Sequence, residues 1–239
     1  MHKMDTEDWK EATRHQRYSQ LRRFLRWLWE YHHAPKLDGV VRRVPKPRPR
    51  NVTVRRDELE TVMEKAKPSL RLWLLLCSDL GLRSGTANKI SGTHYDAEKK
   101  ELRFCTKGGS KQTLPVTEEI AQIIAPLDHH TDKPYVWQLR QQDRKRGPES
   151  KTYAASGLRR ELKAIGESIN ANRFIPHDLR RTSAVAVYEE TGDLRAVQQF
   201  LGHINLETTL QYLDHDSVKV SRSVLERIKR PAWRKERTA

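Results

Sequence analysis

Three prolines at alternating positions, Pro45, Pro47 and Pro49, restrict the fold of this chain more than any other feature. Proline lacks the amide hydrogen that helices need, so the surrounding segment favours an extended, semi-rigid conformation. Residues 41–56 carry seven Arg and Lys and no Asp or Glu. We therefore expect a basic linker between a short N-terminal part and a larger C-terminal part. The alternative is a merely solvated linker, which does not require such one-sided charge.

The whole chain is strongly basic. Its 239 residues contain 46 Lys and Arg against 31 Asp and Glu, a formal net charge of +15. This excess points to a polyanionic partner, either nucleic acid or an anionic membrane surface. The linker residues that we expect to contact phosphates are Arg42, Arg43, Lys46, Arg48, Arg50, Arg55 and Arg56.

Composition and patterning exclude several classes of protein. The chain is 36% hydrophobic and contains six Trp, which argues against disorder. Its longest apolar run, residues 70–82, contains charged residues and is shorter than the ~18 residues of a membrane span. The first residues lack the apolar core of a signal peptide, and the two cysteines form no zinc or disulfide pattern. We expect a cytoplasmic, nucleoid-associated protein without a membrane partner.

Hydrophobic spacing predicts a mainly helical protein. Apolar residues recur at helical intervals over residues 6–33, 57–67 and 70–82, and again from Leu158 to Ile169. Thr117 is a candidate N-cap, residues 140–152 resemble an exposed loop, and two glycines end later helices: Gly192 and Gly202.

Residues 93–116 change from helical to alternating hydrophobic spacing. Tyr95 and residues 101–106 and 111–116 alternate as short strands, with turns between them. The fold class is therefore mainly α with a small antiparallel three-stranded β-sheet. The expected domains are a helical N-terminal segment, the basic linker, a catalytic domain with a C-terminal helix and a tail: residues 1–40, 41–56, 57–230 and 231–239.

Several basic and aromatic residues stand in a suggestive order. His177 and Arg180 are three residues apart and share one face of a helical turn. His203 follows Gly202, and Tyr212 comes nine residues later. Upstream, Arg83 closes the apolar helix of residues 70–82, and Lys107 lies at the mouth of a hairpin. Taken singly, each residue has an ordinary structural explanation, such as a helix-terminal charge or a buried histidine.

Taken together, these residues resemble the active site of the tyrosine recombinase (phage integrase) family. The family signature runs Arg, Lys, HxxR, His or Trp, and Tyr. Here the sequences GLRS, TKGGSKQTLPV, HDLRRTSA, LGH and TTLQYLDHD match its boxes across roughly residues 50–225. The resemblance implies a catalytic domain of this type, with these residues in the site: Arg83, Lys107, His177, Arg180, His203 and the nucleophile Tyr212.

The chemistry of a phosphodiester explains why these residue types belong together. Arg83 and Arg180 can clamp the non-bridging oxygens, where charge builds, and His203 can add a donor. A tyrosine phenol has an ordinary pKa near 10, and His177 can accept its proton. Lys107 can protonate the leaving 5′-oxygen. No magnesium-binding carboxylate cluster accompanies these residues, so we expect neither a metal nor another cofactor.

The chain departs from the family pattern in two places. The family commonly has Glu three residues after the first arginine, where this chain has Thr86, so we expect a reduced or re-routed organisation of Arg83. Only 40 residues precede the linker, fewer than a full core-binding domain needs, so we expect a core-binding region that is either truncated or naturally reduced. Lys111 is a rival general acid, and Arg181 stands where the family often has His.

The expected function is site-specific DNA recombination, by cleavage and rejoining of strands through a covalent 3′-phosphotyrosyl intermediate without metal or ATP. The expected partners are double-stranded DNA and further copies of the chain, in a tetramer on paired sites. We also expect the protein to belong to a mobile genetic element. The alternatives are a catalytically silent DNA-binding regulator on the same scaffold and a topoisomerase of type IB that relaxes DNA.

Overall fold

The chain folds into two compact units, residues 1–50 and 51–239. The division falls inside the basic linker. The computed structural model describes residues 8–47, 52–106, 109–142, 151–171, 174–210 and 212–213.

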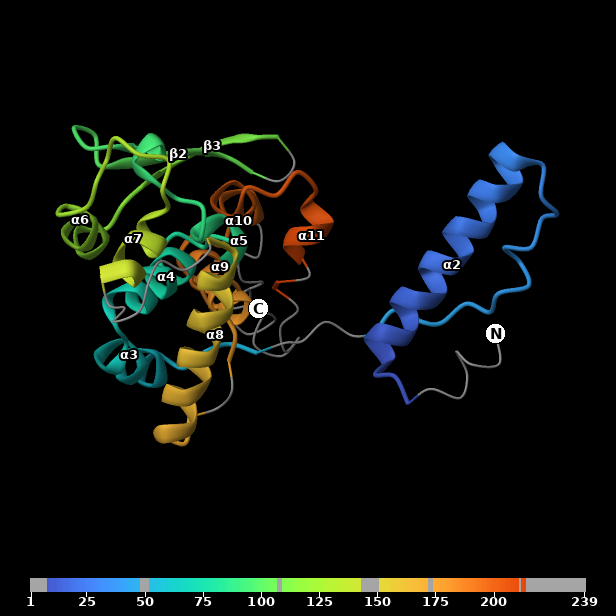
Figure 1. The fold of residues 1–239 in the computed structure, drawn as a ribbon, viewed down its shortest axis with the longest axis horizontal. Coiled ribbons are helices and arrows are strands. Elements are labelled where there is room, and N and C mark those ends of the chain that lie inside the picture. Colours follow the sequence, from blue (N-terminus) through green and yellow to red (C-terminus); the bar gives the residue numbers. More distant parts are fainter. Residues whose placement is uncertain are drawn as a thin grey trace, which may run out of the picture. The chain divides into compact units, whose positions relative to one another are not determined.

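The first unit is a long helix with an extended segment folded back along it. Helix α2 spans Glu11–His32, and the chain turns at His33, which has a left-handed backbone with φ 51° (Figure 1). The returning segment is bonded to the helix, because Arg22 donates to the Val41 carbonyl at 2.7 Å. Tyr18 and Val41 are buried between the two, with 1% and 2% of their surface exposed.

Helix α4, Pro68–Ser78, is the centre of the second unit. Pro68 occupies its first turn, where a missing amide hydrogen costs nothing, and nearly every residue from Ser69 to Cys77 is buried. Helix α3 (Arg56–Lys65) precedes it and packs on α8. The helices that contact α4 include α6 (Glu118–Ile124), α7 (Tyr135–Gln142), α8 (Lys151–Ser168) and α9 (Pro176–Thr191).

The predicted three-stranded sheet is confirmed, as is the mainly helical fold class. Strands β1 (Tyr95–Asp96), β2 (Glu101–Cys105) and β3 (Lys111–Pro115) are antiparallel in the order β1-β2-β3. Leu102 pairs with Leu114, and both point into the core. The turn of residues 97–100 joins β1 to β2, as the sequence predicts.

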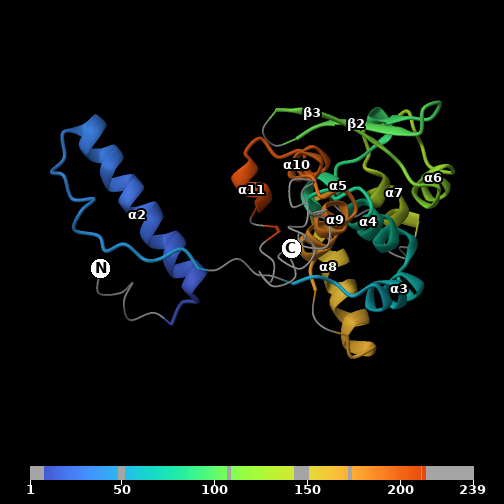
Figure 2. The same cartoon turned by 180° about the vertical axis from the view of Figure 1, so that it is seen from behind.

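Two short helices complete the described part of the chain. Helix α10 spans Leu194–Leu201 and helix α11 spans Leu206–Leu210; both lie below the β2–β3 hairpin (Figures 1 and 2). The predicted stops at Gly192 and Gly202 are confirmed, because both glycines cap helices with φ near 60°. A small apolar cluster that includes Val197, Leu201 and Tyr212 joins α10 and the residues after α11 to α9.

The structure corrects two predictions about helix ends. Helix α4 stops at Ser78 rather than at residue 82, because Gly81 adopts a left-handed backbone with φ 59° and turns the chain. Arg83 therefore does not close α4; it is the N-cap of the next helix, α5 (Ser84–Ala87). In the expected loop of residues 140–152, α7 continues to Gln142 and α8 begins at Lys151, while 143–150 lie outside the described residues.

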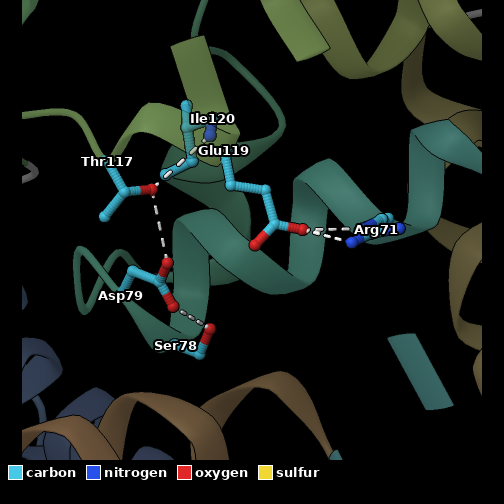
Figure 3. A network of polar contacts seen from close by, with 6 residues as sticks. All are labelled: Arg71, Ser78, Asp79, Thr117, Glu119 and Ile120. Atoms are coloured by element: carbon cyan, nitrogen blue, oxygen red, sulfur yellow. Dashed lines mark hydrogen bonds and ion pairs between the residues drawn. The ribbon is translucent and has the colours of Figure 1, made fainter. Parts of the chain in front are cut away.

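A network of polar contacts anchors the end of α4 beside this turn (Figure 3). Asp79 accepts hydrogen bonds from the hydroxyls of Ser78 at 2.7 Å and Thr117 at 3.5 Å. Thr117 also caps α6 by accepting from the Ile120 amide, which confirms it as an N-cap. Burial raises the pKa of the Asp79 carboxyl. These contacts fix the position of the chain where it enters the turn before Arg83.

Candidate active site

The first turn of α9 places His177 and Arg180 side by side. Pro176 starts the helix, and the Asp178 carboxylate accepts a hydrogen bond from the Ile175 amide at 2.9 Å. This side chain satisfies one of the amides that a helix leaves free at its start. His177 remains partly exposed, whereas only 2% of Arg180 is exposed.

Arg180 is a buried cation held by three acceptors from different segments. It donates to the Gly81 carbonyl, to the Leu201 carbonyl at 2.6 Å and to Nε2 of His203 at 3.0 Å. Burial, together with the neighbouring charge of Arg83, lowers the pKa of Arg180 to about 10. Arg180 still carries its charge at neutral pH, so the three acceptors position a permanent cation.

The end of α10 delivers His203 to this cation. Gly202 turns the chain with φ 60°, and the His203 amide bonds to the Gln198 carbonyl at 3.0 Å. Gln112, on β3, donates to the Phe200 carbonyl at 2.8 Å and so ties the hairpin to the same helix end. Burial and the positive charge of Arg180 lower the pKa of His203 to about 4. The imidazole is therefore neutral at neutral pH.

Tyr212 lies against both histidines. Its hydroxyl is 3.2 Å from Nε2 of His177, and its ring is 5.2 Å from that of His203. The Arg180 guanidinium lies 5.8 Å from the centre of the tyrosine ring. Burial lowers the pKa of His177, and the charge of Arg180 lowers it as well, to a smaller extent. The imidazole of His177 is therefore free to accept a proton at neutral pH.

Arg83 faces an open pocket of about 310 Å³ that His203 and Thr208 also line. Within the part of the chain that the structure describes, no hydrogen bond or ion pair occupies its guanidinium. In the same described part of the chain, the Thr86 side chain makes no hydrogen bond to this guanidinium. A free guanidinium beside the buried charge of Arg180 makes the pocket suited to an anion such as phosphate.

The structure thus brings together five of the six residues taken from the sequence as catalytic: Arg83, His177, Arg180, His203 and Tyr212. Lys107 lies outside the described residues. Its rival Lys111 is exposed at the start of β3, and Arg181 is buried in α9. One expected role differs: Arg180 can only donate, so Nε2 of His203 accepts a hydrogen bond and, as placed, offers no proton to a phosphate.

The predicted phosphate contacts of the linker are divided between the units. Arg42, Arg43 and Lys46 belong to the first unit, whereas Arg55 and Arg56 lie at the start of α3. Arg48 and Arg50 lie outside the described residues.

Sequence reasoning missed several groups that hold the site. The carbonyls of Gly81 and Leu201 have no sequence signal, because every residue has a carbonyl. Thr209 and Gln112 are ordinary polar residues in the sequence. Only the fold places Thr209 against His203 and Gln112 against α10. Across the described ranges, no three His, Cys, Asp or Glu side chains gather in a way that can hold a metal ion.

A tyrosine beside histidines and arginines, on a helical domain with a small sheet, defines the class of tyrosine recombinases. Residues 53–218 match the model of the phage integrase family, and the chain belongs to this family of DNA-cleaving and rejoining enzymes. Tyrosine recombinase XerC of Escherichia coli O127:H6 (strain E2348/69 / EPEC) is 27% identical over 209 residues, which cover 84% of this chain and 68% of the relative.

Two solved structures share the fold. The Tn1549 transposon integrase, solved in complex with transposon right end DNA, superposes with a TM-score of 0.64 at 15% identity, covering 95% of this chain and 82% of that chain. The integrase from mycobacterium phage Brujita gives a TM-score of 0.52 at 19% identity, covering 95% and 75%. None of the helices that the structure describes has the length and apolar character needed to cross a membrane.

Proposed function

We propose that this protein recombines DNA at specific sites by cleaving and rejoining strands through a covalent 3′-phosphotyrosyl intermediate, with neither metal nor ATP. The observation that carries the proposal is the 3.2 Å contact between the Tyr212 hydroxyl and Nε2 of His177. It joins a nucleophile to a base that is neutral at neutral pH, beside the fixed cation of Arg180.

The proposed reaction begins when the scissile phosphate enters the pocket beside Arg83 and Arg180. The Tyr212 oxygen attacks phosphorus, and its proton passes to Nε2 of His177. The bond from phosphorus to the 5′-oxygen breaks, and Lys107, by its resemblance to the family's hairpin lysine, supplies a proton to that oxygen. Attack by a 5′-hydroxyl on the phosphotyrosine ester reverses every step, so rejoining needs no energy source.

The proposed partners follow from the same chemistry. Double-stranded DNA supplies the phosphate, and the XerC relative and the DNA-bound Tn1549 integrase support this choice. Exchange between two sites needs two cleaved duplexes, so we propose a tetramer on paired sites. The predicted C-terminal helix, after residue 213, lies outside the described residues. We propose, as part of the same function, that the protein acts at the nucleoid.

Trapping the covalent adduct tests the proposed nucleophile. The full chain is incubated with a pool of random-sequence duplexes that carry nicks, because a nick near the cleavage point lets the short fragment with the free 5′-hydroxyl diffuse away and prevents rejoining. We expect a protein–DNA adduct on a denaturing gel. Sequencing of the DNA in that adduct then identifies the target site. Tyr212→Phe should abolish the adduct, since it removes the attacking oxygen.

Tyr188→Phe is the matched control, because Tyr188 packs against the same apolar cluster as Tyr212. It should retain the adduct. An adduct from Tyr212→Phe would exclude this nucleophile. DNA binding without any adduct from the unaltered chain would favour the silent regulator, and relaxation of supercoiled plasmid by a monomer would favour the topoisomerase.

A further inference from the structure

Thr209 is a buried polar residue to which the reaction above gives no role. It lies on α11, three residues before Tyr212, and its exposed fraction is 0%. Its hydroxyl is 3.0 Å from Nδ1 of His203, which is also buried, with 7% exposed. A hydrogen bond between two groups this far from solvent is costly to lose, because water cannot replace either partner.

The two neighbours of His203 determine which nitrogen carries the proton. A neutral imidazole has one N–H donor and one acceptor nitrogen. Arg180 has only donors, so Nε2, at 3.0 Å from its guanidinium, must be the acceptor. The proton therefore resides on Nδ1, whose side-chain partner among the described residues is the Thr209 hydroxyl, which accepts the hydrogen bond.

We propose that Thr209 is a positioning residue for the reaction: by accepting the Nδ1 proton of His203, it keeps Nε2 free to hold Arg180 in place. The chain of contacts runs from Thr209 through His203 to the guanidinium that Gly81 and Leu201 also hold. The role of Thr209 in the reaction rests on the proposed function, whereas the protonation of His203 does not.

Valine in place of threonine isolates the hydroxyl, because the two side chains have nearly the same shape. In Thr209→Val, Nδ1–H loses its acceptor in a buried place. The tautomer with the proton on Nδ1 thereby loses its hydrogen bond, so the tautomer with the proton on Nε2 becomes relatively more favourable. In that second tautomer an N–H points at the donors of Arg180 and no longer holds the guanidinium. Thr209→Ser keeps the hydroxyl and should keep the arrangement.

Nitrogen NMR of ¹⁵N-histidine-labelled protein tests the tautomer directly and needs no DNA. In the unaltered chain at neutral pH, we expect His203 to have a proton on Nδ1 and a bare Nε2. The His203 signals are assigned by their loss in His203→Gln. Thr209→Ser should keep this pattern, whereas Thr209→Val should shift it toward a proton on Nε2. A proton on Nε2 in the unaltered chain overturns the proposal.

Single-turnover cleavage of a nicked duplex at saturating protein tests the catalytic part. Thr209→Val should form the adduct about tenfold to a hundredfold more slowly, as expected for losing one buried hydrogen bond that acts in the transition state. Its DNA affinity should not change. Thr209→Ser should restore the rate to within about threefold of the unaltered chain, by the same reasoning.

Thr61→Val is the matched control, since among the described residues the partner of the Thr61 hydroxyl lies within α3 itself, the Asp57 carbonyl at 2.8 Å. It should leave the cleavage rate unchanged. An unchanged rate in Thr209→Val, or an equal loss in the serine variant with the fold intact, overturns the positioning role. If the unaltered chain forms no adduct on any DNA, the proposed function fails, and the NMR result alone decides the protonation of His203.

Discussion

At the scale of single residues, the site is organised around the buried charge of Arg180. A buried guanidinium is costly unless acceptors surround it, and here a loop carbonyl, a helix-end carbonyl and an imidazole supply them. The same charge acts on its neighbours. Burial is the largest cause that lowers the pKa of His177 and of His203, and the charge of Arg180 is the second. The two histidines are thereby neutral and able to accept hydrogen bonds at neutral pH.

The low pKa of His203, about 4, predicts a specific loss of stability in acid. An unfolded histidine has a pKa of about 6.5, so below that pH the unfolded chain binds a proton that the folded chain refuses. The free energy of unfolding should therefore fall as the pH drops from about 6.5 to about 4, by up to about 3 kcal/mol from this residue. Above that range the contribution of His203 should be flat.

Urea unfolding of the full chain between pH 7 and pH 4.5 measures this effect. His203→Gln cannot titrate, so its free energy of unfolding should fall less steeply over the same range. The other histidines act equally in both proteins and cancel in the difference. Parallel pH profiles for the two proteins would contradict the assigned role of His203.

At the scale of elements, turns rather than helices bring the site together. The left-handed Gly81 ends the approach from α4, and the left-handed Gly202 ends α10. Each turn delivers one group to Arg180 directly: the Gly81 carbonyl on one side and His203 on the other. The hairpin is joined to the second turn because Gln112 bonds to the Phe200 carbonyl.

Replacing Gly81 with alanine should disturb the first turn. Its φ of 59° is one that side chains rarely adopt, and a Cβ there would lie 2.6 Å from the Phe200 ring. We expect Gly81→Ala to lower the free energy of unfolding by about 2 kcal/mol, and to slow adduct formation because Arg83 and the carbonyl that holds Arg180 move.

Gly85→Ala is the matched comparison, four residues further on in α5. A Cβ at Gly85 meets no atom within 4 Å, and alanine is the better helix former. Its free energy of unfolding should stay the same or rise by about 0.5 kcal/mol. Thermal or urea unfolding distinguishes the pair, and equal stabilities would refute the importance of the Gly81 backbone.

At the scale of the whole molecule, the basic residues of the linker differ in how far their charge is available. Arg55 and Arg56 are already paired with acids of α3, Asp57 and Glu60. Arg43 and Lys46 are exposed in the first unit, and no hydrogen bond or ion pair with a described residue occupies them. We therefore propose that Arg43 and Lys46 contribute more to phosphate binding than the pair at the start of α3.

Salt dependence of DNA binding measures these contributions. Each phosphate contact adds about 0.9 to the slope of the logarithm of affinity against the logarithm of salt concentration. The double variant Arg43→Gln and Lys46→Gln should therefore lower the slope by about 2. The double variant Arg55→Gln and Arg56→Gln removes the same charge and should lower it less. Equal slopes in the unaltered chain and the first variant would show that this segment does not bind phosphate.

Local interactions explain why much of the fold could be read from the sequence. Helical spacing, the Thr117 cap, the turn of residues 97–100 and the stops at Gly192 and Gly202 depend on neighbours along the chain. The order and spacing of Arg83, His177, Arg180, His203 and Tyr212 indicated the family for a similar reason: a reaction needs the same groups in every member.

Only the tertiary structure decided how those groups are used. A side chain at Gly81 would meet the ring of Phe200, more than a hundred residues away, so no local pattern predicted this close approach. The proton position on His203 depends on Arg180 and Thr209, which come from two other helices. The residue types in the site were determined by the sequence, whereas the acceptor role of His203 was determined by burial beside a fixed cation.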